Sequence, residues 1–128
     1  MATSLVGGQL FINDQAVSFQ GNSLRMKDGS GDKVIDTQVS GTSVDVIESV
    51  DYTTAKSMVA FDLLSTVENE ALVRGWKSNG LGNVIKYVAS TGVTKVFQKM
   101  CLYTDPEINV SSGGVISIEF EGSQAVTA

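Results

Sequence analysis

The sequence predicts a mainly β fold, an antiparallel β-sandwich or barrel with one α-helix packed on it. Two observations support this fold class. Apolar and polar residues alternate over at least seven short segments, and turn residues separate these segments about every 8–12 positions. A single segment, residues 65–79, carries helix-capping signals instead. The length of 128 residues fits one domain spanning 1–128, with residues 123–128 as a flexible tail.

The first half of the chain predicts strands joined by turns. Residues 8–19 are typical of a hairpin, in which Asn13-Asp14-Gln15 supplies the turn. Residues 21–33 are rich in Gly, Ser and Asp, so we expect an exposed loop there. Residues 34–48 predict a strand region, and Gly41 in its middle indicates a bulge or a sharp bend.

The predicted helix follows a half-buried strand at residues 58–64. Ser65 stands three positions before Glu68, which is the spacing of a capping box, so we expect these two side chains to cap the helix. Asn79-Gly80 predicts the helix end, because glycine adopts the left-handed cap conformation readily. Trp76 is interpreted as the side chain that seats the helix on a sheet, in preference to a ligand-stacking aromatic.

The remaining segments predict strands. Residues 84–89 and 93–103 form a hairpin pattern around Ser90-Thr91-Gly92, and both faces of the second strand are largely apolar. In the final strand, 115–122, side chains alternate between a core face and a polar face. The core face carries Ile116, Ile118 and Phe120, and the polar face carries Ser117, Glu119 and Glu121.

The amino-acid composition argues against catalysis by a Cys-His pair and against nucleic-acid binding. The 14 acidic and 9 basic residues give a net charge of −5, so phosphate backbones are repelled on average. The chain has no histidine, and its single Cys101 can form neither an internal disulfide nor a Cys-His pair, so we expect it to be a small apolar side chain buried in a strand. No signal peptide or apolar run of ~18 residues is present, which predicts a soluble, intracellular protein without membrane insertion.

Two short motifs resemble ligand-binding loops but lack essential parts of them. Asp28-Gly-Ser-Gly-Asp32 has the start of a calcium loop but lacks the further oxygen ligands that such a loop needs. Gly80-Leu-Gly82 follows a helix, whereas a phosphate cradle precedes one. We therefore expect no enzyme activity, no cofactor and no metal.

The order of the segments resembles the tail tube proteins of bacteriophages with contractile tails. The resemblance rests on the hairpin from Gln9 to Phe19, the exposed loop, the strands around the helix at Ser65 to Asn79, and the closing Val115-Ile-Ser-Ile-Glu-Phe-Glu-Gly122. It covers nearly the whole chain as a pattern and contains no signature motif.

The resemblance implies a structural virion protein that self-assembles. Members of this family form hexameric rings whose inner strands join into one β-barrel, and the rings stack into the tube through which the genome is ejected. Implied partners are further copies of the chain and the sheath, tape measure, baseplate and tail terminator proteins. DNA would pass through without specific binding. The implied location is the virion tail, with assembly in the host cytoplasm.

Two sets of site residues are expected on this basis. The polar segment between the early strands is expected to contact a neighbouring subunit or ring, and it comprises Lys27, Asp28, Gly29, Ser30, Gly31, Asp32 and Lys33. The lumen of the tube is expected to be lined by the polar faces of strands whose other face is apolar, at Asp45, Ser117 and Glu119. An acidic wall lets a polyanion slide.

Two alternatives to a phage tail tube remain. The chain is also similar to the tube proteins of type VI secretion systems and contractile bacteriocins. A β-sandwich binding module for sugars or a host surface is the other alternative. Such a module would carry a cluster of exposed aromatic residues, whereas most aromatic residues here fall on the apolar faces of predicted strands.

Overall fold

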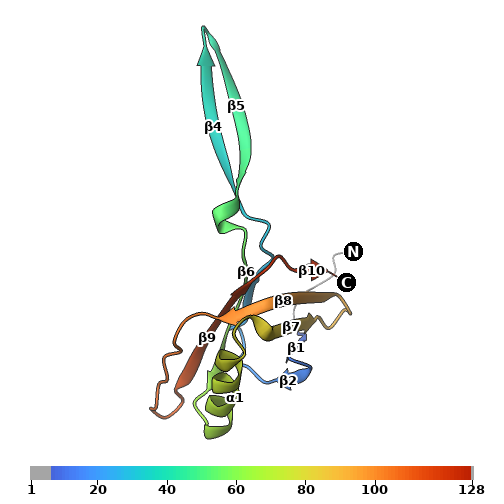
Figure 1. The fold of residues 1–128 in the computed structure, drawn as a ribbon, viewed down its shortest axis with the longest axis vertical. Helices are drawn as coiled ribbons and strands as arrows, with labels where there is room; N and C mark the ends of the chain where they lie inside the picture. The colour runs from blue at the N-terminus through green and yellow to red at the C-terminus, as the bar shows by residue number, and fades with distance from the viewer. Residues whose placement is uncertain (1–6, 128) are drawn as a thin grey trace.

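The computed structural model describes residues 7–127, which contain ten strands and one α-helix (Figure 1). The strands are β1 (Gln9–Ile12), β2 (Gln15–Val17), β3 (Arg25–Lys27), β4 (Asp32–Ser40), β5 (Ser43–Asp51), β6 (Ser57–Leu64), β7 (Asn83–Val88), β8 (Thr94–Leu102), β9 (Val115–Gly122) and β10 (Val126–Thr127). The helix is α1 (Val67–Ser78), and short 3-10 turns lie at η1 (Tyr52–Thr54) and η2 (Gly80–Gly82).

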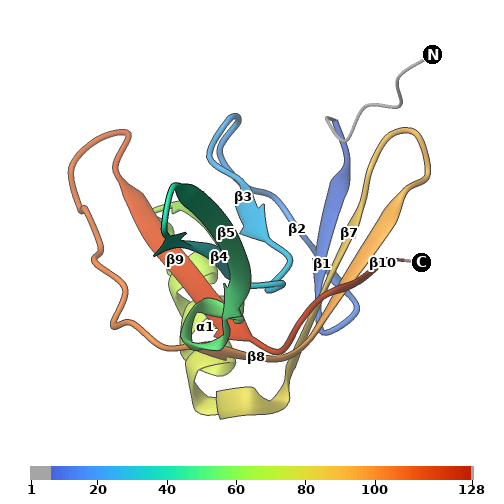
Figure 2. The same ribbon diagram turned by 90° about the horizontal axis from the view of Figure 1, so that it is seen from above.

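The strands form an antiparallel body and a separate hairpin. The body is ordered β2-β1-β7-β8-β9-β6-β3, with β10 pairing with β8, and the hairpin consists of β4 and β5. Seen from above, the β1–β7 half and the β9–β6–β3 half face each other across the core, with β8 joining them (Figure 2). The predicted class is confirmed: the fold is mainly β, its antiparallel sheets pack together, and one helix packs on them.

Strand β8 joins the two halves because a β-bulge bends it. Asn83 pairs with Met100 and Ile85 pairs with Phe97, so β8 carries one extra residue between these pairs. Lys99 lies in this stretch with a φ of 53°. The bulge places both Phe97 and Met100 in the core, which the expected unbroken alternation along residues 93–103 would not allow. Beyond the bulge, the end of β8 pairs with β9.

The first hairpin and the helix end agree with the sequence, whereas the helix start shifts by one residue. Asn13 and Asp14 both have positive φ, as a tight two-residue hairpin turn requires. Thr66 is the N-cap, and its Oγ1 accepts a hydrogen bond from the backbone N–H of Asn69 at 3.1 Å. The predicted capping box at Ser65 is therefore wrong, because the Ser65 hydroxyl donates to the Asn109 carbonyl at 2.6 Å instead.

Other local expectations also need correction. Gly41 is neither a bulge nor a bend within one strand, because it has a φ of 62° in the turn between β4 and β5. The expected loop at 21–33 contains strand β3. Cys101 is half-buried rather than buried. Within the expected flexible tail, Val126 pairs with Val96 of β8.

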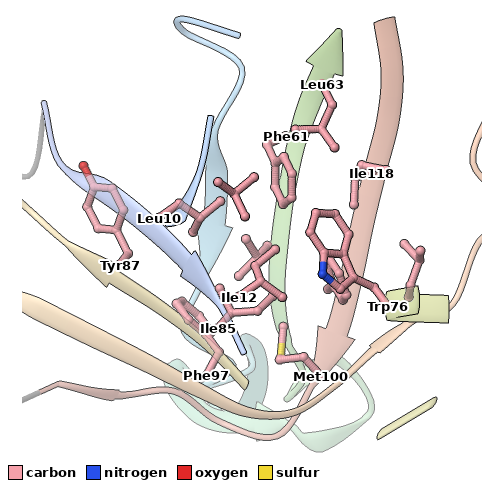
Figure 3. Packing of buried hydrophobic residues seen from close by; sticks show 14 of the residues in the cluster. Leu10, Ile12, Phe61, Leu63, Trp76, Ile85, Tyr87, Phe97, Met100 and Ile118 are labelled. Carbon is pink, nitrogen blue, oxygen red and sulfur yellow. The ribbon is translucent and has the colours of Figure 1, made fainter. Parts of the chain in front are cut away.

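The core lies between the two halves of the body, and α1 covers one side of it. Trp76 of α1 is 5% exposed, and the centre of its ring lies 6.2 Å from that of Phe61 (Figure 3). The ring centre of Phe120 lies 5.9 Å away. This confirms the interpretation of Trp76 as the residue that seats the helix. Asn83 is fully buried, and its Nδ2 donates to the carbonyls of Trp76 and Met100, so it ties the helix end to β8.

Replacement of Trp76 tests this helix contact. Trp76→Ala removes a buried aromatic side chain and leaves a cavity, so we expect the free energy of unfolding of the monomer to fall by about 3–5 kcal/mol. Arg74→Ala is the control on the same helix, since the Arg74 side chain is exposed and only approaches Glu70 at 3.9 Å. Denaturant unfolding measures both variants. Equal losses for the two would contradict the assigned role of Trp76.

Candidate functional site

The most conspicuous surface feature is the β4–β5 hairpin, residues 32–51, which we call the arm. It projects away from the body along the longest axis of the molecule (Figure 1). Every residue of β4 is exposed, and so are Ser43–Ser49 of β5. The tip is open, since a side chain added at Gly41 would meet nothing within 4 Å. The arm therefore takes no part in the core of its own chain.

Hydrogen bonds to the 3-10 turn η1 hold the root of the arm in place. The backbone N–H of Asp32 donates to Thr54 Oγ1 at 2.7 Å, which joins β4 to η1. The Asp51 carboxylate accepts hydrogen bonds from the hydroxyl of Thr53 at 2.6 Å and from its backbone N–H at 3.0 Å. These two bonds, led by that of the hydroxyl, hold the pKa of Asp51 below its usual value. The root is thus ordered by local bonds rather than by burial.

The two faces of the arm differ in chemistry. Directly paired residues of an antiparallel ladder share a face, and successive residues alternate between faces. The pairs Val39–Val44 and Thr37–Val46 therefore lie on one side, and Gln38–Asp45 and Asp36–Ile47 on the other. The first side, the aliphatic face, comprises Ile35, Thr37, Val39, Val44, Val46 and Val50, with Lys33 and Glu48. The second, the polar face, comprises Val34, Asp36, Gln38, Ser40, Ser43, Asp45, Ile47 and Ser49.

The side chains of the aliphatic face are largely exposed to solvent, and the hairpin alone cannot bury them. Ile35, Val39 and Val46 are 68%, 71% and 67% exposed. A two-stranded ribbon is marginal in water by itself, and a long exposed edge is a template for pairing with another chain. Contiguous exposed apolar surface marks an interaction site. The arm therefore has the properties of a surface that is completed by a partner.

The segment Lys27–Lys33 is the root of the arm rather than a free loop. Its Asp28 forms an ion pair with Lys95 at 2.7 Å, and the Asp28 carbonyl accepts a hydrogen bond from Ala125 N at 2.7 Å. Gly29 is buried so closely that an added Cβ would lie 2.6 Å from the backbone nitrogen of Ser57. The expectation of a wholly exposed loop is therefore wrong at Asp28 and Gly29, because an ion pair, a backbone hydrogen bond and close packing hold these two residues against the body.

The three expected lumen residues do not come together. Ser117 is exposed and Glu119 half-buried on the face of β9 opposite the buried Ile118. Asp45 lies on the polar face of the arm, in a separate two-stranded sheet. The predicted alternation in β9 is confirmed, and Asp45 belongs to a strand pair apart from the body, so it shares no sheet face with Ser117 and Glu119.

Charges of both signs line this outer face of the body. The ladder places Glu119 opposite Ala60, which pairs in turn with Arg25. One row along, Glu121 lies 3.7 Å from the Lys56 ammonium. The Glu119 carboxylate accepts a hydrogen bond from the Tyr103 hydroxyl, and this bond raises the pKa of Tyr103 to about 12. The face is therefore polar and nearly balanced in charge rather than purely acidic.

A depression of about 540 Å³ at the root of the arm is lined by charged side chains of both signs, among them Lys27, Asp28, Lys56 and Glu121. Over residues 7–127, no group of three or more His, Cys, Asp or Glu side chains is placed to hold a metal ion. Within the same range, no helix is long and apolar enough to cross a membrane.

The sequence matches no protein-family model, and no curated protein matches it significantly.

The sequence itself contains a pattern that indicates the hairpin of the arm. Gly41-Thr42 stands between two β-branched segments, each alternating with period two, which is the pattern of a hairpin with a two-residue turn.

Titration of Tyr103 tests the geometry at Glu119. Removing the acceptor charge with Glu119→Gln should lower the Tyr103 pKa from about 12 toward the ordinary value of 10. Because the folded-state pKa is raised, the bond stabilises the fold fully below pH 10 and is lost as pH rises through 12. Ultraviolet absorbance follows the ionisation, and Glu68→Gln on the helix is the control. An unchanged Tyr103 titration in Glu119→Gln would contradict the contact.

Proposed function

We propose that the chain is a self-assembling structural protein, the subunit of a tail tube of the kind found in bacteriophages with contractile tails. Copies form hexameric rings, the rings stack, and the tube is the conduit for genome ejection. The observation that carries this proposal is the arm, whose exposed aliphatic face is typical of a surface that a partner covers. The fold supports it, because the segment order that resembles tail tubes forms a β-sandwich with one helix.

The proposal assigns a mechanical role to the chain. Contacts within and between rings build the tube, and the proposed role needs no catalytic residue, cofactor or metal. The root segment Lys27–Lys33 contacts the neighbouring ring together with the arm that it carries. Sheath, tape measure, baseplate and tail terminator proteins are the proposed partners, and the virion tail is the proposed location. A tube protein of a type VI secretion or contractile bacteriocin particle is the alternative within the same class.

In this tube, Ser117 and Glu119 face the lumen. They lie on the outer face of β9, where side chains alternate with the core residues Ile116 and Ile118. A near-balanced wall in a chain of net charge −5 offers phosphates few unopposed cations. DNA would therefore slide without being held, which is what a conduit requires.

Truncation of the arm tests the assembly role. Replacing residues 33–50 by a short Gly-Ser link removes no buried side chain of the core, so the body should stay folded. The parent should form rings and tubes in electron micrographs, with baseplate components added as nuclei, whereas the truncated chain should form no stacked tubes. A parent that stays monomeric under nucleated conditions would sink the proposal. Normal tubes from the truncated chain would remove the arm from assembly.

Lysine substitution tests the lumen assignment. Ser117→Lys with Glu119→Lys places basic groups on the proposed wall, so tubes should assemble but pass DNA more slowly because the wall now binds phosphates. Glu68→Lys with Ser78→Lys, at two exposed positions of α1, adds the same charge away from the proposed wall and should leave passage unchanged. DNA ejection from reconstituted particles is the measurement. Undiminished passage in the double variant would show that this face is not the lumen.

A further inference from the structure

The body carries an apolar groove that its own arm does not fill. It lies beside β1, β7 and β3, has a volume of about 460 Å³, and is lined by Phe19, Leu24, Met26 and Tyr87 with Gly7, Gly8, Gly21, Asn22 and Lys95. Phe19, Leu24 and Met26 are only partly buried, although they pack on the core. The Tyr87 hydroxyl accepts a hydrogen bond from Gly8 N at 3.2 Å, which fixes the ring in the wall.

The charge in the groove is already neutralised. Lys95 is the ionic residue of the lining, its side chain is 14% exposed, and its ammonium contacts both carboxylate oxygens of Asp28 at 2.7 and 2.9 Å. A ligand that enters the groove therefore meets aliphatic and aromatic surface and no unpaired cation. An apolar occupant gains the burial energy of its own surface here, whereas an anion gains no free partner.

The same chain provides a matching apolar surface on the arm. The aliphatic face near the tip presents Val39, Val44 and Val46, and its two charged groups, Lys33 and Glu48, form an ion pair with each other. The polar face instead carries Asp36 and Asp45. Pressing these acids against a second chain of net charge −5 would cost both desolvation and repulsion. Charge thus selects the aliphatic face as the docking face.

We propose that the aliphatic face of the arm docks in the apolar groove of a second copy of this chain. The arm extends away from its own body, so the contact is made between copies (Figure 1). It joins two different patches and is therefore heterologous, which generates a ring or an open stack rather than a closed pair. This assignment rests on the tube function proposed above and specifies which surfaces hold the copies together. It leaves Asp36 and Asp45 directed away from the receiving copy.

Adjacent residues of β5 give a matched pair of variants. Val44 lies on the aliphatic face and Ser43 on the polar face, and both are exposed. Val44→Asp places a charge in the apolar contact, so tube yield should fall about tenfold or more, since each tenfold corresponds to about 1.4 kcal/mol. Ser43→Asp adds the same charge on the opposite face and should leave the yield near that of the parent. Equal yields of the two variants would overturn the choice of face.

Cross-linking between copies tests the groove directly. In a Cys101→Ser background, chains with Val44→Cys are mixed with chains with Leu24→Cys, assembled and oxidised. A disulfide-linked pair of the two chains is expected, because docking brings the Cα atoms within the ~4.4–6.8 Å that a disulfide spans. Ser43→Cys mixed with Leu24→Cys is the control and should not link.

The outcomes separate this assignment from the tube function. Tubes with the Val44–Leu24 link, and without the control link, support it. Tubes without that link, or with equal linking from Ser43, overturn the groove while leaving the tube function in place. Failure of the parent chain to form tubes overturns the tube function and this contact with it.

Discussion

The structure depends on the bend in β8, because this one strand pairs with β7 along its first half and with β9 at its end. The extra residue near Lys99 turns the strand and lets Phe97 and Met100 point into the same core. Two half-sheets thereby enclose a single core that the helix completes through Trp76. Since the body buries its apolar surface without help from residues 32–51, the arm is free to project.

Other segments of the chain cover the strand edges of the body, whereas the strand edges of the arm are exposed within residues 7–127. The chain covers the free side of β6 with Gln20 N, which donates to the Asp62 carbonyl, and with Ser23 Oγ, which accepts from Asp62 N. The residues after β8 cover β9, where Ile108 bridges to Ile116. The arm has no comparable cover within residues 7–127 and exposes aliphatic side chains as well. Because a soluble chain normally hides such an edge, this contrast supports assembly as the purpose of the arm.

Part of the candidate site was predictable from the sequence and part was not. The polar face of β9, with Ser117 and Glu119, follows from alternation alone. The arm was mistaken for one bent strand, and its root segment for a free loop. The sequence pattern of an apolar strand face is the same whether its own chain or a neighbouring chain covers it. The alternation of Val44 and Val46 therefore could not show that this face is exposed.

What the sequence by itself determined is local: the turn at Asn13-Asp14, the helix end at Asn79-Gly80, the strand faces and the absence of histidine chemistry. These depend on backbone preference and side-chain period, which neighbouring residues set. Tertiary structure alone decided the bulge near Lys99, the Thr66 cap and the separation of Asp45 from Glu119. Each of these depends on which distant segment lies alongside, such as Asn109 drawing away the Ser65 hydroxyl, and that choice is made only when the whole core packs.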